Sequence, residues 1–194
     1  MLLRKALLGL MVLAPFSAAS ATGIDFRLGS KTAEIVVLTQ SATFGYGGAD
    51  IGYGFFYNEH NDYMASGSML VSGSSSGDVR ALHFGVGAKL YVGSLDMAPD
   101  RRDGGGLAIG GQVRYVFPAS TPLAILGEAF IAPSVTSMSN FDGISEYRVA
   151  LELEVTPSAR AYVGYRQLKV DLSNGTGPKY KLDDRAHVGV RFSF

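Results

Sequence analysis

The last ten residues of the chain alternate strictly between two kinds of side chain. In a β-strand successive side chains point to opposite faces, so this pattern predicts a strand with one apolar face and one polar face. Ten residues is about the length of one membrane-crossing strand. The apolar face holds Ala186, Val188, Val190, Phe192 and Phe194, and the other face holds Arg185, His187, Gly189, Arg191 and Ser193.

The same period-two pattern returns in earlier segments. Between Glu146 and Val155 the odd positions are apolar or aromatic, and the even positions are mostly charged. Residues 51–57, 82–92 and 107–117 alternate in a similar way, with glycine and charge on the polar face. Small residues between long charged ones suit the crowded inside of a barrel better than the wet face of a soluble sandwich. We therefore expect an all-β chain that folds as a transmembrane, antiparallel, up-and-down β-barrel.

The number of such segments favours ten strands. An even number brings both ends of a barrel to the same side of the membrane, as in bacterial single-chain barrels. The alternative is eight strands, with residues 22–45 forming a plug or an irregular arm. The ten candidate strands are residues 24–29, 33–40, 47–57, 62–72, 79–92, 104–117, 121–132, 143–155, 159–171 and 185–194. The long outer connections are then expected near 93–103, 133–142 and 172–184.

The first 21 residues have the features of a cleavable signal peptide. Arg4 and Lys5 precede an apolar run over residues 6–16, and Ala19-Ser20-Ala21 fits a cleavage site. We expect a mature barrel over residues 22–194 that is exported to the bacterial outer membrane. No later run is apolar and long enough for a transmembrane helix.

Composition narrows the chemistry that this chain can perform. The 17 Lys and Arg residues balance the 17 Asp and Glu residues, so a basic footprint for nucleic acid is missing. Without cysteine, a disulfide framework, a cysteine-based zinc site and thiol catalysis are excluded. Only three histidines are present, and no metal site or cofactor is expected.

Charged residues on the polar faces of the last three strands are expected to meet inside the barrel. A tight turn at Pro157 would place Glu154 opposite residue 160 or 162, so that Glu152 and Glu154 lie beside Arg160 and Arg166. Isolated charges in a narrow lumen are costly, so an interlocked network that fills the lumen is the favoured interpretation. A charged pore that selects ions is the alternative. The candidate network consists of Arg148, Glu152, Glu154, Arg160, Arg166, His187 and Arg191.

Some inward positions are apolar, which supports an occluded interior. They are Leu126, Phe130, Leu168 and Val170.

Two weaker hypotheses concern the outer rim. Asp183 and Asp184 lie three or four residues before His187, and an Asp/His group at the rim would suit a barrel-embedded hydrolase. The preferred explanation for these three residues is ordinary loop solvation and packing in the lumen. Residues 100–103 would form a mobile charged loop that could contact lipopolysaccharide phosphate.

The second half of the chain resembles the YfaZ family of outer-membrane proteins. The matching features are the run Gly110-Gly111-Gln112-Val113-Arg114-Tyr115, Leu126 to Phe130, Gly164-Tyr165-Arg166, and the end from Val188 to Phe194. The resemblance implies an outer-membrane β-barrel and brings no activity or ligand residues with it. Phe192 and Phe194 also resemble the signal that the barrel-assembly machinery reads. We expect a monomer in contact with outer-membrane lipid and lipopolysaccharide, with a structural or surface-interaction role, or alternatively a narrow channel.

Overall fold

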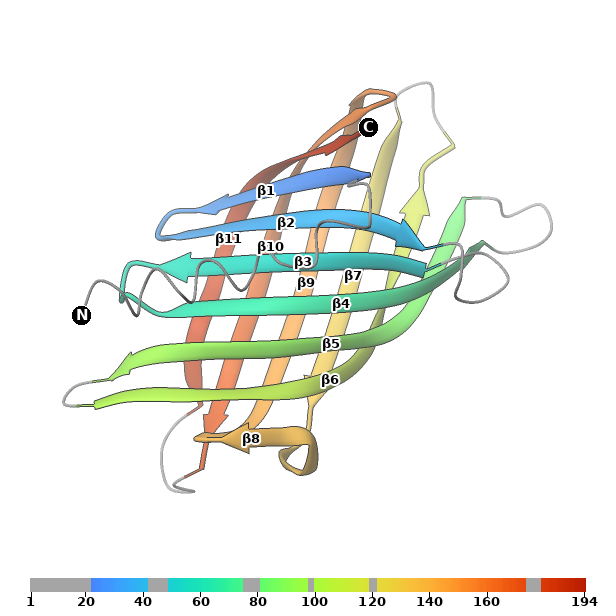
Figure 1. Ribbon diagram of the computed structural model, residues 1–194. Coiled ribbons are helices and arrows are strands. Elements are labelled where there is room, and N and C mark those ends of the chain that lie inside the picture. The colour runs from blue at the N-terminus through green and yellow to red at the C-terminus, as the bar shows by residue number, and fades with distance from the viewer. Residues whose placement is uncertain (1–21, 42–48, 75–80, 98–99, 119–121, 174–178) are drawn as a thin grey trace.

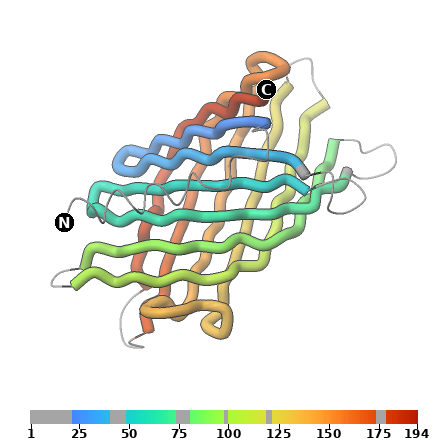
Figure 2. Tube along the Cα trace, in the orientation of Figure 1, coloured from blue at the N-terminus to red at the C-terminus, as the bar shows by residue number. Residues whose placement is uncertain are grey.

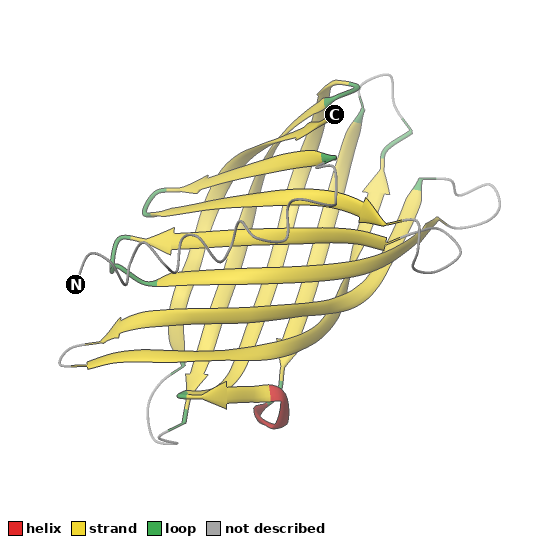
Figure 3. Ribbon diagram, in the orientation of Figure 1, coloured by secondary structure: helices red, strands yellow, loops and turns green. Residues whose placement is uncertain are grey.

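The computed structural model describes residues 22–41, 49–74, 81–97, 100–118, 122–173 and 179–194. The expected signal peptide over residues 1–21 lies outside the described residues. Figure 3 shows that the described chain is nearly all strand, with one short helical turn, η2 (Ser134–Thr136). No helix in these ranges is long and apolar enough to cross a membrane.

The strands lie close to the positions that the alternation predicts. Their bounds are β1 (Gly23–Gly29), β2 (Thr32–Ser41), β3 (Ala49–Asn58), β4 (Tyr63–Ser74), β5 (Leu82–Met97), β6 (Asp100–Val116), β7 (Leu123–Ala132), β8 (Ser137–Ser139), β9 (Phe141–Thr156), β10 (Ala159–Leu172) and β11 (Tyr180–Ser193).

Ten of these strands close into an antiparallel barrel. Each pairs with its neighbours along the chain, and β1 pairs with β11 from Gly23 opposite Ser193 to Gly29 opposite His187. The short β8 adds to β6 beyond the end of β7. In Figure 1 the front wall of β1 to β6 crosses the back wall of β7, β9, β10 and β11 at a steep angle, and Figure 2 shows the same crossing in the Cα trace. Strand tilt of this kind is what closes a sheet into a barrel.

The ten-strand prediction is confirmed, and the eight-strand alternative is wrong. Both β1 and β2 are paired along their length, β1 with β11 and β2 with β3. Their poor hydrophobic alternation did not prevent this, because backbone hydrogen bonds hold a strand in a closed sheet whatever its side chains.

The faces of the strands follow the predicted parity. In β9, Val149 and Leu151 are exposed on the outside, whereas Arg148 and Ala150, which alternate with them, are buried in the lumen. The turn at Pro157 places Glu154 opposite Arg160, one of the two registers expected. Nearly all of the exposed large apolar side chains lie on the outward faces of the strands, so the barrel presents an apolar surface of the kind that contacts lipid.

Strands extend into two of the expected long connections. Residues 93–97 pair with residues 100–104, so the expected mobile loop at 100–103 belongs to a hairpin. Likewise β11 begins at Tyr180, well before the expected residue 185. The apolar alternation ends where the strands leave the apolar belt, but backbone pairing continues beyond it. Sequence periodicity therefore underestimated the strand lengths.

A closed barrel of this kind predicts heat-dependent mobility on a denaturing gel. Because every barrel strand is paired on both sides, detergent alone should not unfold the protein. Unboiled samples are expected to migrate as a band distinct from that of boiled samples. A single band at the same position under both conditions would contradict the closed barrel.

The lumen of the barrel as the candidate functional site

The middle of the lumen contains a network of buried ion pairs, which we call the lumen charge network. It comprises six carboxylates and six cations, each in at least one ion pair. They are Asp25, Glu34, Glu128, Glu146, Glu152 and Asp183, with Arg27, Lys89, Arg114, Arg148, Arg166 and Arg191.

Arg166 on β10 is the centre of one half of this network. Its Nη1 atom lies 2.5 Å from Oε2 of Glu34 on β2 and 3.6 Å from Oε1 of Glu146 on β9. Its Nε atom donates to Asp183 on β11 at 2.9 Å. The guanidinium also lies 4.7 Å from the ring centroid of Phe56 on β3. One side chain thus links β10 to four other strands of the back and front walls.

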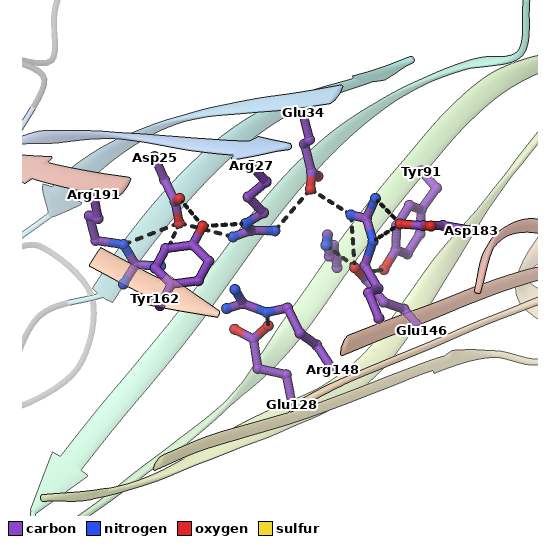
Figure 4. A network of polar contacts seen from close by, with 12 residues as sticks. Asp25, Arg27, Glu34, Tyr91, Glu128, Glu146, Arg148, Tyr162, Asp183 and Arg191 are labelled. Carbon is purple, nitrogen blue, oxygen red and sulfur yellow. Dashed lines mark hydrogen bonds and ion pairs between the residues drawn. The ribbon is translucent and has the colours of Figure 1, made fainter. Parts of the chain in front are cut away.

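Asp25 on β1 is the centre of the other half. Arg27 and Arg191 both approach its Oδ2 atom, at 3.1 and 2.7 Å, and the Tyr162 hydroxyl donates to its Oδ1 atom. Figure 4 shows Tyr162 and Arg191 converging on Asp25, with Arg27 continuing the chain to Glu34. Because Asp25 and Arg191 are directly opposite each other, this cluster fastens the seam between the first and last strands.

Charge is balanced within the network. The twelve groups, of which eight are buried and four are partly buried, have equal numbers of each sign and so no net charge among them, and every member has a partner of opposite sign within 4.0 Å. Buried ions are tolerated when they are paired and hydrogen-bonded. An ion-selective filter would instead present a ring of one sign.

Several residues expected in the lumen are there, but with different partners. Glu152 pairs with Arg114 on β6 at 2.7 Å rather than with Arg160 or Arg166. Arg148 pairs with Glu128 on β7 at 2.5 Å. Only Arg160 and Glu154 meet as expected, at 3.7 Å, and both are about one-third exposed. The expected pairing was wrong because it considered only the last three strands: Arg148 pairs with Glu128 directly opposite on β7, and Glu152 reaches past β7 to Arg114 on β6.

The sequence interpretation missed the residues that β1 and β2 contribute. Asp25, Arg27 and Glu34 form the bridge between the two halves of the network. Asp25 and Arg27 do alternate with the apolar Phe26 and Leu28, which is a short stretch of the same polar and apolar alternation seen in the later strands. An alternation over four residues was too short to assign these charged side chains to the lumen.

The candidate hydrolase residues do not form a catalytic arrangement. Asp183 faces the lumen and binds Arg166, whereas Asp184 faces outward and accepts from Gln167 and Lys181. An extra residue, Leu182, interrupts the pairing of β11 with β10 at this point. The ring nitrogens of His187 have no hydrogen-bond partner among the described residues, and the ring packs at 6.0 Å from that of Tyr162. No described carboxylate therefore orients this histidine.

A layer of buried apolar side chains fills the lumen on one side of the charge network. We call it the apolar plug. Every barrel strand except β1 and β2 contributes to it. Its members are Phe56, Met64, Tyr91, Leu95, Ala108, Phe130, Ala132, Phe141, Ile144, Leu168, Val170 and Leu182, all at most 3% exposed. The four apolar residues that alternation places inward, Leu126, Phe130, Leu168 and Val170, are all buried, and the last three belong to the plug.

The turn between β3 and β4 covers the plug at the end of the barrel away from Phe194. Asp62 is fully buried there, accepting from the Tyr180 hydroxyl at 2.7 Å and from the backbone N–H of Asp96 at 2.7 Å. Asn58 donates to the carbonyl of Leu182 at 3.3 Å. On the outer side of this turn Lys31 pairs with Glu59 at 2.6 Å and lowers the pKa of that carboxyl. Contacts to β5 and β11 thus hold the turn across the mouth.

A cavity of about 450 Å³ lies on the opposite side of the network. It reaches the end of the barrel where Thr22 and Phe194 lie. Its walls include Gly52, Gly54 and Ser66 from the front wall of the barrel. The lumen is therefore asymmetric, with space at the terminal end and dense packing at the other. Within the described part of the chain, no group of three or more His, Cys, Asp or Glu side chains is arranged to hold a metal ion.

Comparison with known families agrees with this architecture. The family model described as YfaZ precursor matches residues 3–194, which is nearly the whole chain. The chain belongs to the YfaZ family. This membership confirms the resemblance seen in the sequence, and it extends that resemblance to the half of the YfaZ chain that contains β1 to β5.

Three solved structures are similar to this YfaZ protein at a low level. Two are "KdgM porin" and "KdgM porin in complex with disordered oligogalacturonate", each with 12% identity, a TM-score of 0.44, and coverage of 90% of this chain and 99% of that chain. The third is the outer membrane channel DcaP of Acinetobacter baumannii, with 12% identity, a TM-score of 0.42, and coverage of 91% and 63%. No curated protein matches the sequence. The barrel assignment rests on the strand pairing of this chain itself.

Proposed function

We propose that this protein is a monomeric barrel of the bacterial outer membrane whose lumen is closed and whose role is structural or surface-interacting. The apolar plug carries this proposal, because side chains from eight strands pack there with at most 3% of each exposed, which leaves little room for ions to pass. The balanced charge network supports it, since it links the walls of the barrel without leaving a ring of one sign. The separation of Asp183, Asp184 and His187 argues against a hydrolase.

The C-terminal strand supports assembly into that membrane. Phe192 is exposed on the outward, apolar face of β11 and Phe194 is exposed just after this strand, at 43% and 79%. These exposed aromatic side chains would be available for the barrel-assembly machinery to read. Outward apolar residues along all ten strands would then contact outer-membrane lipid and lipopolysaccharide.

Conductance in planar bilayers tests whether the lumen is closed. The wild-type protein is expected to show no steady current. Phe56 and Met64 are directly opposite each other in the plug, so the variant Phe56→Ala with Met64→Ala should produce discrete openings. Phe55→Ala is the matched control, because Phe55 faces lipid and its loss should leave the barrel closed. Folding of each variant is verified by its gel mobility.

A narrow channel is the second candidate function, and the cavity of about 450 Å³ favours it. Among the described residues, the lumen charge network, the plug and the turn that contains Asp62 lie beyond this cavity. Large steady currents through the wild-type protein would establish the channel and reject the closed barrel. No current through the wild-type protein, with openings only after Phe56→Ala and Met64→Ala, would support the closed barrel and reject the channel.

A further inference from the structure

The front wall of the cavity is lined by small, uncharged side chains. Gly52 and Gly54 on β3 lie opposite Ser68 and Ser66 on β4. A methyl group at Gly54 would come within 2.6 Å of the Ser66 Oγ atom, and one at Gly52 within 2.7 Å of the Ser68 Oγ atom. The two glycines therefore leave these hydroxyls room to face the cavity. Gln112 on β6 lines the same space.

These uncharged groups have hydrogen-bonding capacity that the described residues do not use. No hydrogen bond between described residues involves the side chain of Ser66 or Gln112, and Ser68 makes only a long one of 3.5 Å to the Gly52 carbonyl. A hydroxyl and a primary amide can each both donate and accept. A solute in the cavity would therefore meet several groups suited to its own hydroxyls.

The charged residues around the cavity are already engaged. Arg27 and Arg191 bind Asp25, Lys89 binds Glu146 at 2.6 Å, and Glu128 binds Arg148 at 2.5 Å. Asp50 accepts from Gln40 and Ser72, and Arg160 has Glu154 at 3.7 Å. A charged ligand would have to compete with these pairs, whereas an uncharged ligand would leave them intact.

We propose that this cavity is a binding site for a small, neutral, polyhydroxylated solute of the size of a mono- or disaccharide. Its volume of about 450 Å³ lies within the usual range of ligand pockets. The solute would enter from the end where Thr22 and Phe194 lie, because the apolar plug closes the other side. This site goes beyond the closed-barrel function, since a solute can bind whether or not the barrel conducts.

Solution NMR of the folded protein in a sugar-free detergent tests the site directly. Sucrose is the probe, and the side-chain amide of Gln112 is identified by its loss in Gln112→Ala. Saturable shifts of this amide and of the Ser66 backbone amide are expected. Gln112→Ala should weaken sucrose binding about tenfold, the effect of one well-placed hydrogen bond. The matched control is Gln167→Ala, which removes a glutamine from the outward face and should leave the affinity unchanged.

Ser66→Leu places a larger apolar side chain in the cavity and removes the hydroxyl, so it should strongly weaken the saturable shifts. Ser66→Ala removes the hydroxyl with little change in volume and should also weaken sucrose binding, so it replaces the leucine variant if that variant does not fold. Non-saturable shifts, or equal affinities for wild type and Gln112→Ala, would overturn the proposal. Tighter binding of gluconate than of sucrose would overturn the neutral class of ligand, because it would assign recognition to Arg160 or Arg191. None of these results depends on conductance, so failure of the closed-barrel proposal is detected separately.

Discussion

Replacing Arg166 by methionine is expected to lower the free energy of unfolding by about 3–5 kcal/mol, the usual cost of breaking a buried ion pair by removing one partner. Methionine keeps much of the length of the side chain and removes the charge. Glu34 retains Arg27 at 3.0 Å, but Asp183 loses its only ionic partner among the described residues. A buried carboxylate without a counter-charge is the main source of the loss.

The measurement is urea unfolding of the refolded barrel, followed by gel mobility. Arg160→Met is the matched control, because Arg160 is about one-third exposed and 3.7 Å from its partner, so its loss should cost about 1 kcal/mol or less. The pair Arg166→Met with Asp183→Asn should lose less than the two single changes added together. Strict additivity, or an equal loss for Arg160→Met, would contradict the lumen charge network.

Placing a charge on the lipid face should be nearly as damaging. Val149→Arg on β9 exposes a guanidinium to hydrocarbon near the middle of the strand, at a cost of about 2–4 kcal/mol. The same charge introduced by Gln112→Arg enters the cavity directly opposite Glu128 on β7 and should cost about 1 kcal/mol or less. Val149→Ile controls for the change of side chain alone.

Refolding into lipid vesicles and urea titration compare these variants. If Val149→Arg and Gln112→Arg refold equally well, then either the assigned faces or the membrane location is incorrect. A loss confined to Val149→Arg would support both assignments, because only a lipid-facing position has a depth-dependent penalty for charge.

The sequence alone determined where the strands are and which way their side chains point. Within one strand the alternation of side chains is a local property of the backbone, so periodicity is enough to assign Val149 and Ala150 to opposite faces. The register of β9 and β10 was narrowed to two choices for the same reason, since a tight turn at Pro157 joins them. Glu154 opposite Arg160 is one of those choices.

The tertiary structure alone decided which charges meet. Arg166 and Glu34 are 132 residues apart in the chain, and they come together only because β1 pairs with β11 and closes the barrel. Periodicity assigns a face to each residue, but it does not define distances across a lumen. Glu152 therefore pairs with Arg114 on β6, although Arg160 is nearer in sequence.

Two further features lie beyond what periodicity predicts. The extra residue Leu182 lets Leu182 and its neighbour Asp183 both face the lumen, which regular alternation does not allow. The division of the lumen into an apolar plug and a polar cavity depends on how the side chains of both walls fill a closed space. Alternation along single strands identified the inward residues, and only the closed barrel determined which of them pack together and where room remains.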